Sequence, residues 1–94
     1  MKQHNNAWHH LKNLLDLSVP TVAGIPIVEM AGNQRVLIEN HNGVVEYGTT
    51  KIVILVKIGK IVVSGSNMEI CHMSRQQVVI TGCIDSVSVE RGCN

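Results

Sequence analysis

Aromatic residues are nearly absent from this chain of 94 residues, which contains no phenylalanine, one tryptophan and one tyrosine. Its core must therefore be aliphatic. The formal net charge is only +1, and no cluster of basic residues stands out. Single-strand binders use aromatic stacking platforms, and any nucleic-acid binder needs several lysines or arginines on one face to neutralise phosphates. The composition therefore disfavours nucleic-acid binding.

Long hydrophobic runs are also missing. The longest, residues 52–56, is far shorter than the ~20 residues that a helix needs to span a bilayer, and the N-terminus is too polar for a signal peptide. We expect a soluble chain that is cytoplasmic unless a partner carries it elsewhere. A chain of this length makes one small domain with a modest core, so a partner or an oligomer would add stability.

Cysteine is sparse, and its three positions, Cys71, Cys83 and Cys93, show no CxxC spacing. An odd number without paired spacing is a poor disulfide framework. We expect small buried thiols in a reducing compartment, with a Cys71–Cys83 bridge between neighbouring strands as the alternative.

No cofactor or small-molecule substrate is indicated. The histidines at 9, 10 and 72 and the three cysteines lack the paired short spacings of a structural zinc site. No glycine cluster opens a helix to cradle a phosphate, and the carboxylates are scattered along the chain. These patterns argue against a metal centre and against nucleotide binding.

What the sequence does contain is a series of short valine- and isoleucine-rich runs separated by glycines, which is typical of strands joined by tight turns. A short edge strand is expected at 27–30, and about seven strands follow it, at 34–39, 44–47, 51–58, 61–64, 68–73, 77–81 and 84–90. Gly59, Gly65 and Gly82 are expected to be structural turn residues. The prediction is an all-β domain, a curled antiparallel meander forming a small sandwich or roll. A short β-solenoid is the alternative.

A hairpin is predicted at Asn40–Gly43. The Asn42-Gly43 pair favours it, because both residue types tolerate the positive φ of two-residue turns. This turn would join the strands at 34–39 and 44–47.

One amphipathic helix is expected, at Ala7–Leu17, where apolar residues recur at helical spacing. Two alternatives stay open for it. The helix can close over the open face of the sheet, or it can dock on a partner or membrane through Trp8, Leu11, Lys12 and Leu15. The predicted organisation is a tail and helix at 1–19, followed by a single domain at 20–91.

The order of residues from Val36 to Tyr47 resembles the signature of the YabP/YqfC family of sporulation proteins, and the YqfC-type branch in particular. The resemblance rests on Ile38, Glu39, Asn40, His41 and Gly43, followed by Tyr47. Later glycine-containing segments, 59–65 and 78–87, match the family's pattern in the same order. The resemblance covers roughly residues 14–90.

The resemblance implies a non-enzymatic protein made during endospore formation, in the mother cell. It implies a role in engulfment or in coat or envelope assembly. The implied partner is another sporulation protein, either soluble or membrane-bound. Its expected place is the cytoplasm of the mother cell, or the periphery of the forespore membrane or coat. A self-assembling structural β module, a homo-oligomer, is the alternative.

His41 is the residue that most invites a catalytic reading. Catalysis would require a nucleophile or a second acid beside it, and the sequence identifies neither. We therefore expect Glu39, Asn40, His41, Gly43 and Tyr47 to serve turn structure or partner contact.

Overall fold

The computed structural model describes residues 24–92, which form a single antiparallel sheet of six strands in the order β1-β2-β6-β5-β4-β3. The strands are β1 (Ile27–Ala31), β2 (Arg35–Glu39), β3 (His41–Tyr47), β4 (Lys51–Val56), β5 (Gly59–Met73) and β6 (Gln77–Arg91). The predicted all-β class is confirmed. The predicted helix with Trp8, Leu11, Lys12 and Leu15 lies outside the described residues, as does the predicted boundary at residue 19.

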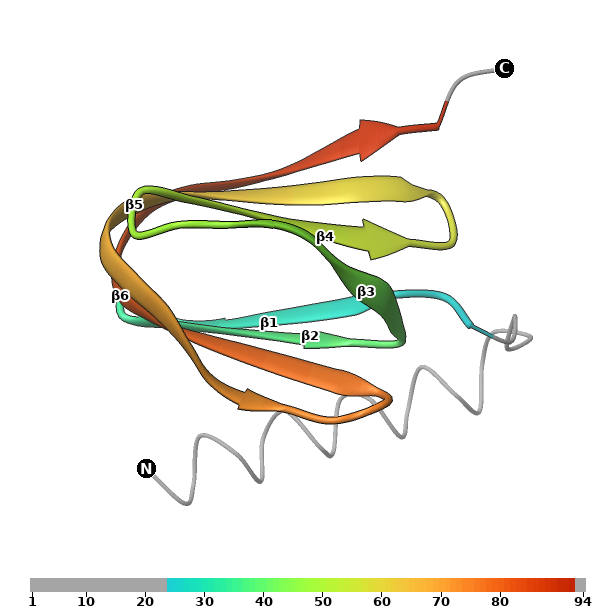
Figure 1. The fold of residues 1–94 in the computed structure, drawn as a ribbon, viewed down its shortest axis with the longest axis horizontal. Helices are drawn as coiled ribbons and strands as arrows, with labels where there is room; N and C mark the ends of the chain where they lie inside the picture. Colours follow the sequence, from blue (N-terminus) through green and yellow to red (C-terminus); the bar gives the residue numbers. More distant parts are fainter. Residues whose placement is uncertain (1–23, 93–94) are drawn as a thin grey trace.

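The sheet doubles over because its two longest strands bend in the middle (Figure 1). β5 and β6 are each 15 residues long, and they pair with each other along most of their length. The first half of β5 continues into β4 and β3, whereas the first half of β6 continues into β2 and β1. Two layers therefore face each other, although they belong to one sheet.

The bends lie at glycines that were predicted to be turn residues. Gly65 lies inside β5 and Gly82 inside β6, so each pair of short strands predicted around them is one long bent strand, and the predicted number of strands was too high. A Cβ built on Gly65 would overlap the carbonyl oxygen of Cys83, and one on Gly82 would lie 2.7 Å from the carbonyl oxygen of Asn67. Only glycine lets the two backbones approach this closely.

Two loops preserve the backbone hydrogen bonding at the bends. Loop 49–50 accepts bonds from β5, and loop 33–34 accepts bonds from β6. The four bonds run from Gly65 N–H to Thr50 O (3.1 Å), Met68 N–H to Thr49 O (2.9 Å), Gly82 N–H to Gln34 O (3.1 Å) and Ile84 N–H to Asn33 O (2.7 Å). The register shifts in this region thus leave these N–H groups paired.

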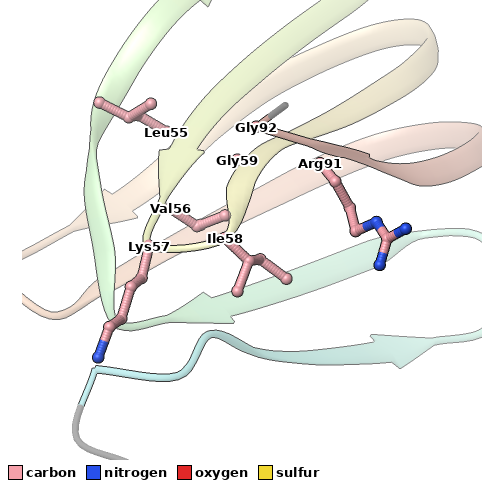
Figure 2. A pocket seen from close by; sticks show the side chains of 7 residues that line it. All are labelled: Leu55, Val56, Lys57, Ile58, Gly59, Arg91 and Gly92. Atoms are coloured by element: carbon pink, nitrogen blue, oxygen red, sulfur yellow. The ribbon is translucent and has the colours of Figure 1, made fainter. Parts of the chain in front are cut away.

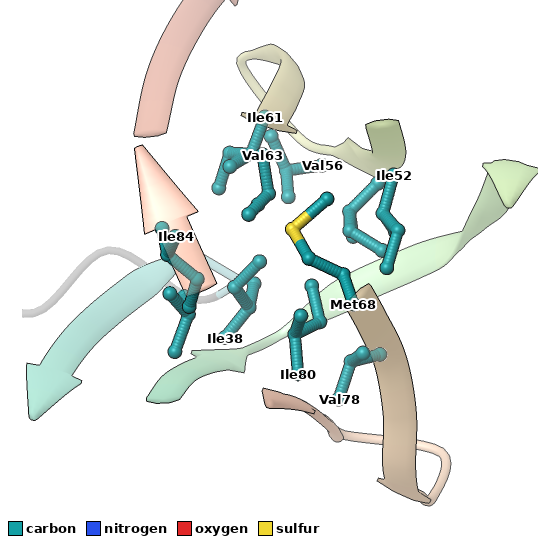
Figure 3. Packing of buried hydrophobic residues seen from close by; sticks show 11 residues of the cluster. Ile38, Ile52, Val56, Ile61, Val63, Met68, Val78, Ile80 and Ile84 are labelled. Atoms are coloured by element: carbon teal, nitrogen blue, oxygen red, sulfur yellow. The ribbon is translucent and has the colours of Figure 1, made fainter. Parts of the chain in front are cut away.

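The core between the layers is aliphatic, as predicted, with one methionine at its centre (Figure 3). Its members come from every strand except β1 and β3 and are almost fully buried: Val36, Ile38, Ile52, Ile54, Val56, Ile61, Val63, Met68, Val78, Ile80 and Ile84. Apolar alternation along each strand supplies one face to this core. Folding one sheet over itself therefore buries the apolar faces of both halves.

The topology corrects two further predictions. β2 and β3 are not paired, so residues 40–43 do not form a hairpin; the chain instead crosses there from one layer to the other. β3 to β6 do form a meander, but β2 lies beside β6. The β-solenoid alternative is wrong, because every pair of strands is antiparallel.

Replacing Gly65 with alanine should lower the free energy of unfolding by about 3 kcal/mol, or prevent folding, because the new methyl group meets backbone that cannot move aside. Urea denaturation followed by circular dichroism measures this. Gly48→Ala is the matched control, since its Cβ would meet nothing closer than 3.5 Å. Equal stability of the two variants would contradict the proposed role of Gly65 in the bend.

Candidate functional site: the junction between the layers

The chain passes between the layers at Asn40, which has φ of +66°. Asparagine adopts this left-handed conformation more readily than most residues. Its backbone N–H donates to the carbonyl of Gln76 at 2.6 Å, and its side-chain Nδ2 donates to the carbonyl of Ile25 at 2.8 Å. Asn40 thus joins the start of β1, the crossover and the β5–β6 turn.

His41 is the one buried polar residue in the described part of the chain, with 8% of its surface exposed. Its Nδ1 accepts a hydrogen bond from Gly43 N–H at 3.0 Å, and its Nε2 lies 2.8 Å from the carbonyl oxygen of Ser74. A carbonyl can only accept, so Nε2 carries the proton and the ring is the neutral Nε2–H tautomer. Both ring nitrogens are therefore occupied by backbone groups.

The turn that receives these bonds is itself well braced. Ser74 Oγ accepts from the N–H groups of Gln76 and Gln77 at 3.3 and 3.0 Å. The Gln77 side-chain amide donates to Glu39 Oε2 at 3.0 Å. Glu39, Asn40 and His41 thus each bond to the turn at residues 74–77, far away in the sequence.

These partners could not be found from the sequence. Ser74, Gln76 and Gln77 give only a turn signal, and Ile25 contributes a backbone carbonyl that carries no sequence signal at all. The sequence drew attention to residues 39–41, but not to the groups with which they form hydrogen bonds.

In the described residues, the acid and hydroxyl nearest in the junction, Glu39 and Ser74, are themselves bonded to the turn. A shallow hollow of about 240 Å³ beside His41 is lined by Lys57 and Arg75 together with glycine, asparagine and glutamine residues. Among residues 24–92, no carboxylate, thiol or hydroxyl side chain lines it. Using His41 as a base would also require breaking its bond to Gly43.

Tyr47 lies apart from the rest of the motif, at the far end of β3, and is 59% exposed. Its hydroxyl accepts a hydrogen bond from Ile70 N–H at 3.2 Å. Tyr47 therefore connects β3 to the second half of β5. Gly59, which was expected to be a turn residue, is the first residue of β5, and a Cβ there would overlap the Glu90 carbonyl oxygen.

A larger hollow of about 730 Å³ lies at the β4–β5 turn, beside the end of β6 (Figure 2). Apolar side chains of Leu55, Val56 and Ile58 line it, with Lys57 and Arg91 as its charged groups. The described part of the chain contributes no acid or nucleophile to its wall.

The cysteines differ from the prediction. Cys71 and Cys83 are free and exposed, so neither the predicted burial nor the alternative bridge is found. Within residues 24–92, no group of three or more histidine, cysteine or acidic side chains could hold a metal ion. The same region contains no helix long and apolar enough to cross a membrane.

The junction lies within a segment that matches a known protein family. The model of the YabP family matches residues 25–92. The chain belongs to the YabP family. It is also 27% identical over 86 residues to the uncharacterized protein YqfC of Bacillus subtilis (strain 168), covering 92% of this chain and 90% of the relative. The suspected YabP/YqfC resemblance is therefore confirmed. No solved structure matches the chain significantly.

His41→Ala should lower the free energy of unfolding by about 2–3 kcal/mol, because it leaves the Ser74 carbonyl and the Gly43 N–H without their partners. Urea denaturation checks this. The control is His72→Ala, at an exposed position, which should change stability by no more than about 0.5 kcal/mol. If the two histidine variants are equally stable, the junction does not depend on His41.

The ring of His41 should be the Nε2–H tautomer in solution, since Nδ1 is held as an acceptor. Long-range proton–nitrogen NMR spectra at neutral pH distinguish the two tautomers. Spectra showing a proton on Nδ1 would refute the hydrogen-bond assignment.

Proposed function

We propose that this protein is a non-enzymatic assembly or adaptor factor of endospore formation, acting in the mother cell during engulfment or during coat or envelope assembly. Membership of the YabP family over residues 25–92 supports this, together with the resemblance of the Ile38–Gly43 motif to sporulation proteins.

The proposal that the protein is not an enzyme rests on the hydrogen bonds made by the motif residues. Glu39, Asn40 and His41 direct their polar side chains to the backbone or to another structural side chain. Residues retained for chemistry present a free group to a substrate, whereas residues bonded in this way hold strands in position. The motif then defines a shape, and the protein acts through its surfaces.

The edge of β1 is the surface we assign to a heterologous partner. β1 ends the strand order, and its residue Met30 is 42% exposed beside the core. An unpaired edge can accept a strand from another chain, which supplies affinity through main-chain bonds. The partner is another sporulation protein, either soluble or membrane-bound. The N-terminal segment with Trp8, Leu11, Lys12 and Leu15 supplies a second contact.

A self-assembling structural module remains the second candidate. It is favoured because, within residues 24–92, each layer has an edge without a neighbouring strand: β1 in one layer and the end of β6 in the other. Joining unlike edges head to tail would give open polymers.

The test is complementation of a strain in which the gene is deleted, counting heat-resistant spores. Wild type should restore sporulation, whereas deletion of residues 1–17 or Met30→Lys should not, because a lysine facing inward on an edge blocks strand addition. Met73→Lys, at a similarly exposed methionine outside β1, is the matched control and should complement.

Two results would count against the proposal. One is normal sporulation in the deletion strain. The other is full complementation both by the protein that lacks residues 1–17 and by Met30→Lys, once circular dichroism shows that all the proteins are folded.

A further inference from the structure

The sheet formed by residues 24–92 has four edges, and three of them carry features that disfavour regular edge-to-edge pairing with a second copy of the same chain. β1 is only five residues long and follows Pro26. β3 carries two register shifts. The second half of β5 contains a further shift and donates a bond to Tyr47. Short edge strands, prolines and bulges are the devices that natural sheets use to prevent association.

The fourth edge, residues 86–91 of β6, has none of these devices; the nearest register shift in β6 lies just before it, between Ile84 and Ser86. Loop 33–34 covers β6 only as far as Ile84. From Ser86 to Arg91 the pairing with β5 runs without a shift, and the described residues place nothing on the other side (Figure 1). This part of the strand is regular and free of proline.

The hydrogen bonds show to which side of this strand the N–H and C=O groups of each residue point. Gly92 N–H donates to the Ile58 carbonyl at 2.9 Å, so residue 92 faces β5. Direction alternates along an antiparallel strand, so the backbone groups of residues 86, 88 and 90 also face β5. The N–H and C=O groups of Val87, Val89 and Arg91 therefore point outward, where they can bond another strand.

We infer that the occupant of this edge is a second copy of the same chain, paired antiparallel about a two-fold axis at Ser88. In this register Val87 of one copy faces Val89 of the other, and Ser88 faces Ser88. Val87 and Val89 of each copy exchange N–H···O=C bonds with their counterparts, which gives four main-chain bonds in all.

The side chains select this register. Val87 and Val89 lie opposite Val63 and Ile61 on the core side of the layer, and Val89 is 50% exposed. Pairing the valines extends that apolar strip across both copies. The same register brings the end that carries Asp85 in one copy beside the end that carries Arg91 in the other.

Neighbouring registers are poorer. A shift of the axis to Val87 places Val89 opposite Asp85, and a shift to Val89 places Val87 opposite Arg91. Each sets a charge against an apolar side chain at two places, and each keeps one valine–valine pair where the Ser88 register has two.

Such a dimer closes on itself. A two-fold interface uses the same surface in both copies, so it stops at two chains and leaves the β1 edges free. The inference does not depend on a role in sporulation.

Sedimentation equilibrium of the full chain should show a reversible monomer–dimer equilibrium without larger species. Val89→Pro should raise the dissociation constant about tenfold or more, because it removes an outward N–H in each copy while leaving every bond to β5 intact. Val89→Thr keeps that N–H and the branched side chain, and should dimerise like the wild type. Urea denaturation confirms that both variants are folded.

Cross-linking tests the register directly. In a background with the three native cysteines changed to serine, Ser88→Cys should form an intermolecular disulfide on mild oxidation, because the two Ser88 positions face each other across a non-hydrogen-bonded pair. Ser86→Cys is the control, since it faces Glu90 and should not cross-link. Asp85→Arg and Arg91→Asp should each weaken the dimer, and the double exchange should restore it.

A monomer at every concentration would overturn the inference, as would open polymers. Equal cross-linking of Ser86→Cys and Ser88→Cys, or unchanged dimerisation of Val89→Pro, would overturn the assigned edge and register. None of these results would bear on complementation by Met30→Lys, so the two proposals can fail separately.

Discussion

The close approach of two backbones at Gly65 and Gly82 is the constraint on which this structure depends. β5 and β6 remain paired through their bends, and each glycine faces backbone of the other strand. A flat sheet of these strands would leave its apolar face open to water, because residues 24–92 contain no other element to cover it. Bending the central pair lets the sheet supply both walls of its own core.

The sequence predicted the composition of the fold better than its connections. Alternating valine and isoleucine identified the strands, because that pattern reflects burial of one face. Gly65-Ser66-Asn67 was interpreted as a turn, yet the same residues suit a bulge within a continuing strand. Only the pairing with β6 distinguishes the two, and that pairing is not a local property.

The same limit applies to the candidate site. The positive φ expected at Asn42 and Gly43 is found at Gly43 only, and Asn40 adopts it in place of Asn42. The hairpin was wrong because β2 pairs with β6 instead of β3. The acceptor for His41, the Ser74 carbonyl, lies 33 positions away and carries no side-chain signal. A motif built to hold backbone groups can be recognised from the sequence, but its partners need the fold.

The crossover at Asn40 also separates two parts of the chain whose strand pairs differ in sequence separation. β3 to β6 are successive neighbours, so their pairing needs only short loops to close. β2 meets β6 through pairs such as Arg35 with Thr81 and Glu39 with Gln77, which close much longer loops at a greater entropic cost. The β1–β2 hairpin is therefore expected to dock last during folding, onto a meander that is already assembled. The hydrogen bonds of Asn40 and His41 to the turn at residues 74–77 would then form together with this docking and make the final step cooperative.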